Sequence, residues 1–439
     1  MRHTAFLRVA LATVALVGAA CTKKPSDEGK TGSAGSGGVA PPASNTLKIG
    51  VVLSLSGAFA DVGKQIQNGI KTWVKEHGDT VAGKKVEIIY RDTTGPVPEV
   101  AKRLAQELVV QDKVDFLTGF GLTPEALAAA PVATEGKVPM VIMNAATSII
   151  TTKSPYIVRF SLTLPQISTP LGHWAAKNGL KKIATLVSDY GPGHDAEAAF
   201  TKVFTEDGGQ ITEQVRAPMK NPDFSSFVQR IKDAKPDAVF VFVPAGEQSV
   251  QVMKAYKERG LAEAGIKLLA TGDVLDDHQL ATIGDSALDV ISTHHYSVAH
   301  DSPENKAFLE AYKAANGADA GMPNFMSVAA YDCMRAMYDV ATKLDGKIDA
   351  DKAMELFKHM SFTSPRGPIS IDPETRDIVQ TVYLRKTEKV NGELRNVETQ
   401  SFPDQKDPAK AAGGAPPAPP AAPPGAEPAK APAGSGSGK

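Results

Sequence analysis

The feature that most constrains this chain is an alternation of short apolar runs with segments of helical periodicity. Leu47–Leu53 is an almost continuous β-prone run. The segment that follows places four apolar residues on one helical face: Val62, Ile66, Ile70 and Val74. Apolar strands that alternate with amphipathic helices form parallel sheets covered on both faces by helices. The pattern therefore predicts an α/β fold.

The alternation occurs in two successive blocks. The first block predicts further strands at 86–90, 114–117 and 139–143, with helices at 97–110 and 124–134. The second block predicts helices at 166–177, 195–205, 224–233 and 247–259, with strands at 183–187, 211–216, 238–243 and 266–270. Each block is one doubly wound lobe, and such lobes bind ligands at the carboxyl ends of their strands.

The two ends of the chain do not read as part of the folded lobes. Residues 22–45 are rich in Gly, Ser, Pro and Lys, which predicts a flexible tether. Residues 403–439 are dominated by Ala, Pro and Gly, which predicts a disordered tail. That tail is a spacer, a docking segment or an extension without a role. About 360 residues remain between them, which is more than one hydrophobic core usually holds.

The first 21 residues indicate export. Arg2 and His3 precede an apolar run from Ala5 to Val17, which is shorter than the roughly 20 residues that a membrane span needs. We therefore predict a signal peptide over residues 1–20. Residues 17–21, VGAAC, resemble a bacterial lipobox, although Gly18 stands where Leu is usual. This predicts a lipidated Cys21 and a periplasmic protein anchored to the membrane, and ordinary cleavage near Ala19 or Ala20 is the alternative.

Composition excludes several functions. The chain has 48 basic and 49 acidic residues, so no charge excess favours nucleic acid. Only two cysteines are present, and a lipidated Cys21 leaves Cys333 without a partner. Cys333 lies in an apolar helical pattern, which predicts a buried, unreactive thiol.

The short motifs that suggest chemistry each lack a defining residue. Residues 78–84 match the start of a phosphate loop, but Lys85 replaces the magnesium ligand and a strand follows. Residues 119–121 lack the third glycine of a dinucleotide fingerprint, and residues 54–57 lack the leading glycine of a nucleophile elbow. We therefore expect neither an enzyme nor a cofactor.

The histidines do not predict a metal site. His294 and His295 are adjacent, and consecutive residues of a strand point to opposite faces. His300 lies five residues further on. We expect hydrogen-bonded linker or cleft residues here and no metal.

Several segments together resemble one known family. Residues 47–63, LKIGVVLSLSGAFADVG, are similar to the first strand and binding loop of periplasmic solute-binding proteins of the branched-chain amino acid type. Residues 139–147, 189–191 and 364–372 resemble the family's ligand loop, its second-lobe Asp-x-Tyr-Gly region and its late return strand. The resemblance extends over residues 46–402.

The resemblance implies a type I periplasmic binding fold, in which two doubly wound lobes are joined by a three-strand hinge. The implied crossings fall near residues 161–165, 291–296 and 362–368. Lobe 1 is then 46–162 with 297–361, and lobe 2 is 163–296 with 362–402. The implied function is capture of a small carboxylate-bearing ligand by hinge closure for an ABC importer whose permease lies in the inner membrane. We expect a monomer.

The same resemblance implies six ligand-binding residues. The first lobe holds the ligand carboxylate through Ala145 and Thr147, and Leu122 and Thr123 stand where the family usually has serines. Backbone N–H groups at helix starts suit such an anion. Thr123 has a second interpretation as a helix cap. The second lobe contributes Tyr190 and Asp273, and their alternatives are a loop tyrosine and a turn former.

Departures from the family leave the ligand open. Val62 stands where amino acid binders often have tyrosine, and related proteins bind amides, urea or aromatic acids. The ligand is therefore an amino acid or a related amide or aromatic acid. A second function class is a sensory or regulatory lipoprotein of the same fold, which binds a ligand or a partner protein without transport.

Overall fold

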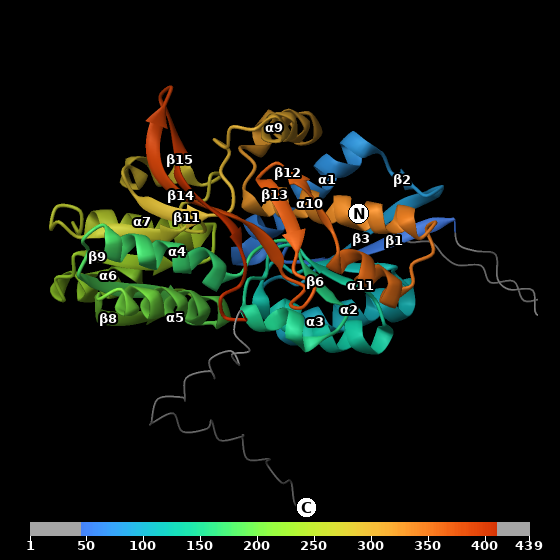
Figure 1. Cartoon of the computed structure of the whole chain (residues 1–439), viewed down its shortest axis with the longest axis horizontal. Helices are drawn as coiled ribbons and strands as arrows, with labels where there is room; N and C mark the ends of the chain where they lie inside the picture. The colour runs from blue at the N-terminus through green and yellow to red at the C-terminus, as the bar shows by residue number, and fades with distance from the viewer. Residues whose placement is uncertain (1–44, 411–439) are drawn as a thin grey trace, which may run out of the picture. The chain divides into compact units, whose positions relative to one another are not determined.

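The structure, a computed structural model, describes residues 45–410 (Figure 1). The predicted signal peptide, Cys21 and nearly all of the predicted tether lie outside the described residues, so these assignments stay predictions.

The first sheet is formed by the first predicted block. Its strands are β1 (Thr46–Leu53), β2 (Thr80–Val81), β3 (Lys84–Asp92), β4 (Phe116–Gly119), β5 (Met140–Ile142) and β6 (Ile157–Arg159). They lie in the order β2-β3-β1-β4-β5-β6 and are parallel except for β2. The apolar run of β1 is buried from Ile49 to Leu53, as a strand covered on both faces must be.

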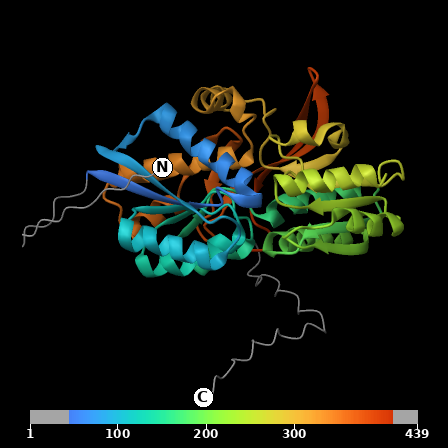
Figure 2. The same cartoon turned by 180° about the vertical axis from the view of Figure 1, so that it is seen from behind.

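Helices cover both faces of this sheet. The helices α2 (Pro98–Glu107) and α3 (Thr123–Gly136) pack on one face, around Val52 and Leu117. The helices α1 (Ala60–His77), α10 (Phe325–Lys343) and α11 (Ala350–Lys358) pack on the other face, around Ile49 and Val51. The helix α9 (Pro303–Asn316) packs against α1, and Figure 2 shows α1 and α10 running side by side. Helices from residues 303–358 thus complete the first lobe.

The second sheet is larger and mixed. Its strands are β7 (Lys182–Ser188), β8 (Gln210–Ala217), β9 (Ala238–Phe242), β10 (Lys267–Thr271), β11 (Ile291–His294), β12 (Ser361–Ser364), β13 (Gly367–Ile371), β14 (Ile378–Val390) and β15 (Glu393–Gln405). Their order is β12-β13-β14-β11-β10-β9-β7-β8, and β15 pairs with β14. The helices α4 (Leu164–Lys177) and α5 (Gly191–Glu206) pack on one face, and α6 (Phe224–Asp233), α7 (Glu247–Glu258) and the short α8 (Leu280–Ile283) pack on the other.

The predicted fold class of two doubly wound α/β lobes is confirmed. The parallel strands are joined by helices, and the chain passes between the sheets three times: between β6 and α4, after β11, and between α11 and β12. These passages fall in or next to the segments expected for the hinge. The exact lobe boundaries stay a proposal.

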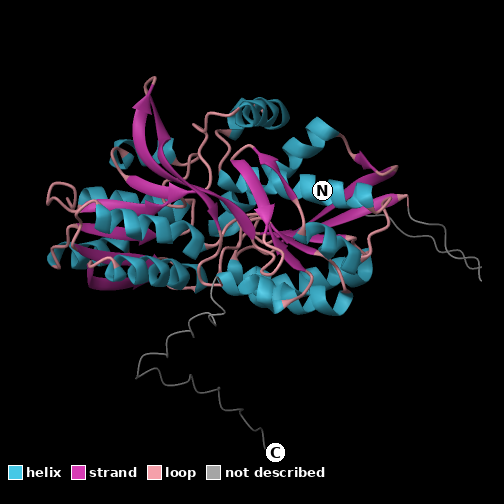
Figure 3. Cartoon of the chain, in the orientation of Figure 1, coloured by secondary structure: helices cyan, strands magenta, loops and turns pink. Residues whose placement is uncertain are grey.

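Of the antiparallel part of the second sheet, only β13 was expected, as the return strand in residues 364–372 that the family resemblance implied. The strands β14 and β15 form a long hairpin whose tip projects from the sheet (Figure 1, Figure 3). Most of β15 is partly or fully exposed and polar, so it lacks the apolar alternation by which half-buried strands are identified.

The described structure continues past the expected start of the C-terminal tail. The strand β15 extends to Gln405, and Asp407 is buried. The segment 406–410, which we call the C-terminal strap, contacts the first lobe through Lys410, whose amine donates to Thr151 Oγ1 at 2.7 Å. Within residues 45–410, no helix is both long enough and apolar enough to cross a bilayer.

Candidate functional site

A cavity lies where the carboxyl ends of strands from both sheets come together. The empty space between its walls, including space that is open to solvent, is about 380 Å³. Its lining, from both lobes, is Val62, Gly121, Leu122, Thr123, Asn144, Ala145, Ala146, Leu164, Tyr190, Pro192, Phe242, Pro244, Ala245, Asp273, Phe325 and Met326.

Topology explains why these residues meet. In the first sheet the strand order reverses between β1 and β4, and in the second it reverses between β7 and β9. A crevice opens at the carboxyl ends of the strands at each such point. The loops after β4, β5, β7, β9 and β10 supply most of the lining.

Two first-lobe loops are tied together beside the cavity. Ala145 N–H donates to the Phe120 carbonyl at 3.0 Å, and the Asn144 side-chain amide donates to the Gly121 carbonyl at 2.8 Å. Phe120 itself has a φ of 55°, which bends the chain directly after β4. These bonds hold the start of α3 against the loop after β5.

Glu125 holds the start of α3 in place through hydrogen bonds. Its Oε2 accepts the Leu122 N–H at 3.0 Å, and its Oε1 accepts the hydroxyls of Ser54 and Thr93. Burial raises the pKa of Glu125 to about 7. We predicted no role for Glu125 from the sequence. An acid three residues after a helix N-cap is half of a capping box, and that signal identifies it.

The first lobe presents hydrogen-bonding groups to the cavity. The hydroxyls of Thr123 and Thr147 are 3.0 Å apart and bond to each other. Among the backbone bonds of residues 45–410, none uses the N–H of Ala146 or Thr147. Free N–H groups and hydroxyls at the start of a helix suit a carboxylate.

Aromatic rings dominate the other side of the cavity. The rings of Tyr190 and Phe242 are stacked, with centroids 6.1 Å apart. Phe325 reaches the cavity from α10 and is buried. Burial raises the pKa of Tyr190 well above its ordinary value, so this phenol is neutral.

Asp273 and His294 form the most polar part of the second-lobe wall. The carboxylate Oδ2 of Asp273 lies 3.6 Å from His294 Nε2, and neither atom has a hydrogen-bond partner among the described residues. Burial lowers the pKa of His294 to about 4, so the imidazole is neutral at pH 7. Gly272 allows this approach, because a Cβ there would lie 2.1 Å from the His294 ring.

The structure brings the six predicted ligand residues together. Ala145, Leu122, Thr123, Tyr190 and Asp273 line the cavity, and Thr147 contacts it through the Thr123 hydroxyl. Their role in binding stays a prediction. His294 lies behind Asp273 in this wall. We expected a hydrogen-bonded linker or cleft residue, and the hydrogen-bonded part is wrong, because neither ring nitrogen of His294 has a hydrogen-bond partner among the described residues.

Three hydrogen bonds join the lobes around the cavity. Ser148 N–H donates to Asp195 Oδ2, the Gln279 side-chain amide donates to Asp61 Oδ2, and the Asn324 side-chain amide donates to Asp276 Oδ2, each at 2.9 Å. Burial raises the pKa of Asp195 to about 6 and that of Asp276 to about 7. The structure is therefore one in which both lobes contact each other across the site.

The site offers binding groups and no assembled catalytic set. Residues 45–410 contain no group of three or more His, Cys, Asp or Glu side chains arranged to hold a metal. Cys333 is buried as predicted, and burial raises the pKa of its thiol well above the ordinary value. The arrangement therefore suits a carboxylate-bearing ligand with a flat apolar body.

Comparison with protein families gives a match over nearly the whole described region. The family model of periplasmic binding proteins matches residues 46–412. A Leu/Ile/Val-binding protein homolog of Brucella melitensis is 47% identical over 369 residues, which are 84% of this chain and 94% of that protein.

Two similar solved structures contain aromatic acids. An ABC-transporter solute-binding protein from Rhodopseudomonas palustris BisB5, in complex with 3,4-dihydroxybenzoic acid, is 55% identical with a TM-score of 0.81. A solute-binding protein from R. palustris in complex with 4-hydroxybenzoate is 49% identical, also with a TM-score of 0.81. Each alignment covers 83% of this chain and 99% of the other.

Proposed function

The chain belongs to the periplasmic binding protein family, and we propose that it captures hydroxylated aromatic acids. It is the solute-binding protein of an ABC transporter and not an enzyme. The observation that carries the ligand assignment is the polarity of the cavity wall. The lining combines hydroxyl and N–H donors of the first lobe, aromatic rings, and the Asp273 carboxylate of the second lobe, whose Oδ2 has no hydrogen-bond partner among the described residues.

The first lobe is the carboxylate end of the proposed site. The Thr123 and Thr147 hydroxyls and the N–H groups of Ala146 and Thr147 donate to the ligand anion. The start of α3 adds the positive end of a helix dipole. No arginine or lysine lines the cavity, so these neutral donors carry the recognition.

The middle of the cavity accommodates a flat ring. Tyr190, Phe242 and Phe325 provide aromatic surface, and aromatic pairs gain about 0.5–1.5 kcal/mol beyond area burial when stacked or edge-on. Val62 and Leu122 add aliphatic walls. A branched-chain amino acid would bury less surface against these rings than a benzoate does.

In the proposed complex, Asp273 binds the ring hydroxyl of the ligand, at the end opposite to the carboxylate. Its Oδ2, which has no hydrogen-bond partner among the described residues, accepts a hydrogen bond from a ring hydroxyl, and the His294 imidazole behind it is neutral. A buried acceptor without a partner costs about 1–3 kcal/mol, so a ligand that supplies the donor is favoured. The two similar proteins of known structure bind hydroxybenzoates, which carry this hydroxyl.

Calorimetry with matched ligands tests the proposal. Wild-type protein is expected to bind 4-hydroxybenzoate more tightly than benzoate and both more tightly than leucine. Asp273→Asn should weaken 4-hydroxybenzoate about tenfold, equivalent to about 1.4 kcal/mol, and leave benzoate within twofold.

Two outcomes would contradict the assignment. Leucine binding that exceeds the aromatic acids, and is lost in Asp273→Asn, would make Asp273 an ammonium partner instead. Equal losses for benzoate and 4-hydroxybenzoate would reject a hydroxyl contact.

The export signal supports a location for this binding step. We propose that the mature protein is tethered in the periplasm through a lipidated Cys21 and delivers its ligand to an inner-membrane permease. Cys21 lies outside the described residues, and the proposal rests on the sequence of residues 1–21. Mass spectrometry of the mature N-terminus tests it, since a free or absent Cys21 would exclude the lipid.

A further inference from the structure

One buried guanidinium holds the loop that carries the proposed anion donors. Arg159, at the end of β6, is fully buried. Its Nη1 donates to the carbonyls of Ala145 at 3.0 Å and Thr147 at 2.8 Å, and its Nη2 lies 3.5 Å from the Ser148 carbonyl. Three carbonyls of residues 145–148, which we call the donor loop, therefore turn toward one side chain.

Peptide geometry converts these contacts into an orientation of donors. The C=O and N–H of one trans peptide point in opposite directions. Because the Ala145 carbonyl faces Arg159, the Ala146 N–H faces away from it, and Ala146 lines the cavity. By the same geometry the Ser148 N–H faces away from Arg159 and donates to Asp195 of the other lobe. Arg159 thus sets the direction of both groups without touching the cavity.

Arg159 is itself held by Asp377, which lies between β13 and β14. Asp377 Oδ1 accepts from Arg159 Nε at 2.8 Å and lies 2.7 Å from Arg159 Nη2. Both side chains are almost completely buried. Removing one partner of a buried ion pair leaves an uncompensated charge, so each residue depends on the other.

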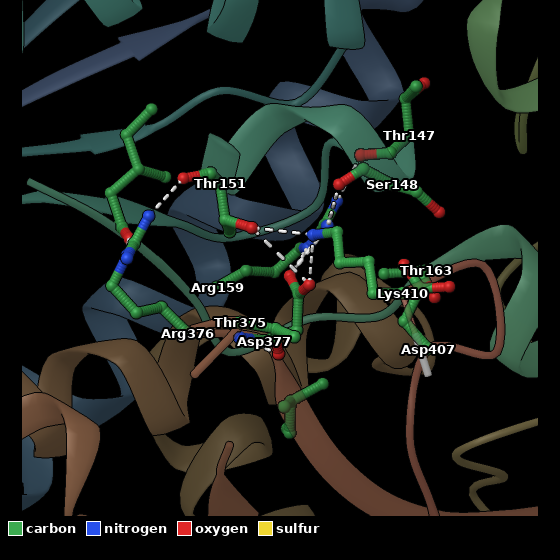
Figure 4. A network of polar contacts seen from close by, with 12 residues as sticks. Thr147, Ser148, Thr151, Arg159, Thr163, Thr375, Arg376, Asp377, Asp407 and Lys410 are labelled. Atoms are coloured by element: carbon green, nitrogen blue, oxygen red, sulfur yellow. Dashed lines mark hydrogen bonds and ion pairs between the residues drawn. The ribbon is translucent and has the colours of Figure 1, made fainter. Parts of the chain in front are cut away.

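The C-terminal strap supplies the second cation of this cluster. Lys410 Nζ bonds to Asp377 Oδ2 and donates to Thr151 Oγ1 at 2.7 Å. In Figure 4, the Arg159 and Lys410 side chains approach the Asp377 carboxylate from different sides. Asp407 of the strap is buried close to this cluster, where nearby Asp377 contributes to raising its pKa.

We propose that Arg159 is a positioning residue for the ligand carboxylate, acting through the donor loop, and that the strap supports it through Lys410. The inference rests on the proposed function, since it gives the donor loop its anion. It differs from a packing role in one respect. A wrongly oriented donor loop loses affinity for a charged carboxylate more than for a neutral analogue of the same shape.

The test compares 4-hydroxybenzoate with 4-hydroxybenzamide by calorimetry. Arg159→Lys keeps the positive charge but loses the guanidinium group that donates to several carbonyls at once. We therefore expect at least a tenfold loss of affinity for the acid and less than a threefold loss for the amide. Lys410→Gln should lower the acid-to-amide preference about threefold, and Lys410→Arg should restore it. The matched control is Arg376→Lys, because Arg376 also binds first-lobe carbonyls, those of Thr151, Ser154 and Ile157, but none of the donor loop.

Two C-terminal truncations of the full-length chain test the role of the strap separately from that of Arg159. A chain that ends at Lys410 should bind like the whole protein, and a chain that ends at Gln405 should lose acid preference as Lys410→Gln does. The pair also keeps the inference testable if Arg159→Lys does not fold.

The possible failures are distinguishable. Equal losses for acid and amide, or an unchanged ratio in Arg159→Lys and in the shorter truncation, would overturn the positioning role. Failure of wild-type protein to bind either ligand would instead reject the proposed function. In that case the amide NMR shifts of Ala146 and Ser148 decide, since positioning requires them to move in Lys410→Gln and to stay in Arg376→Lys without any ligand.

Discussion

At the residue scale, the site depends on carboxyl groups that the fold buries without a full cation partner. Glu125 is the clearest case, because its oxygens accept two hydroxyls and one N–H and no lysine or arginine lies against it. Burial raises its pKa to about 7 from an unfolded value near 4.5. The charged form of Glu125 is therefore the costly one in the folded protein.

This predicts that Glu125 makes its own contribution to the pH dependence of the free energy of unfolding. The folded pKa is the higher one, so the stabilising contribution is complete below about pH 4.5 and is lost as the pH rises through about 7. The loss amounts to about 3 kcal/mol at most. Urea unfolding measured between pH 5 and 8 should show that the free energy of unfolding decreases less with rising pH for Glu125→Gln than for wild type.

Glu247→Gln is the control for this measurement, because Glu247 is also in the first turn of a helix but is exposed. The free energy of unfolding of Glu247→Gln should change with pH as steeply as that of wild type. A Glu125→Gln protein with an unchanged slope would show that Glu125 is not the titrating group.

At the element scale, the start of α5 approaches two different partners through two glycines. A Cβ at Gly191 would lie 2.7 Å from Thr147 Oγ1 in the first lobe. A Cβ at Gly193 would lie 1.8 Å from the Ser188 carbonyl in its own lobe. Two residues apart, these glycines therefore serve different contacts.

The two alanine variants should separate binding from stability. Gly191→Ala obstructs the approach of the lobes, so we expect about a tenfold loss of 4-hydroxybenzoate affinity with a melting temperature close to that of the unliganded wild type. Gly193→Ala forces a clash inside one lobe and should cost about 1–3 kcal/mol in the free energy of unfolding. If Gly191→Ala bound normally, closure would not require the contact with Thr147.

At the scale of the whole molecule, ligand capture couples to the bonds between the lobes. The bond from Ser148 N–H to Asp195 exists only while α5 lies against the donor loop. Burial, with Asp407 nearby, raises the pKa of Asp195 to about 6, while the Ser148 N–H, Arg159 and His194 oppose the shift. We expect an open molecule to return Asp195 to water and to its ordinary pKa near 3.8.

Closure should therefore be favoured at low pH. The closed form holds the Asp195 proton more tightly, so ligand affinity is expected to fall about tenfold between pH 5 and pH 8 and to level off above pH 7. Calorimetry across this range should show the trend in wild type and in Asp233→Asn, whose aspartate is exposed on α6. Asp195→Asn should weaken this trend, and an equal trend in that variant would assign the effect to another group, such as Asp276.

Local pattern was sufficient for most of the elements. The apolar run at Leu47–Leu53 and the helical spacing after it gave β1 and α1 within a few residues. The carboxyl ends of the predicted strands also indicated the binding edge, where Thr123 and Ala145 now lie. These features depend on side chains close together in sequence, whose period reveals which face is buried.

The support of the site was beyond reach of the same reasoning. Arg159 and Asp377 are 218 residues apart, Ser148 and Asp195 are 47 apart, and Lys410 falls in a segment whose composition reads as a tail. None of these pairs produces a periodic pattern in the sequence. Each exists because two lobes and a terminal strap bring distant polar and charged groups into one buried place, where a carboxylate needs a cation or hydrogen-bond donors beside it.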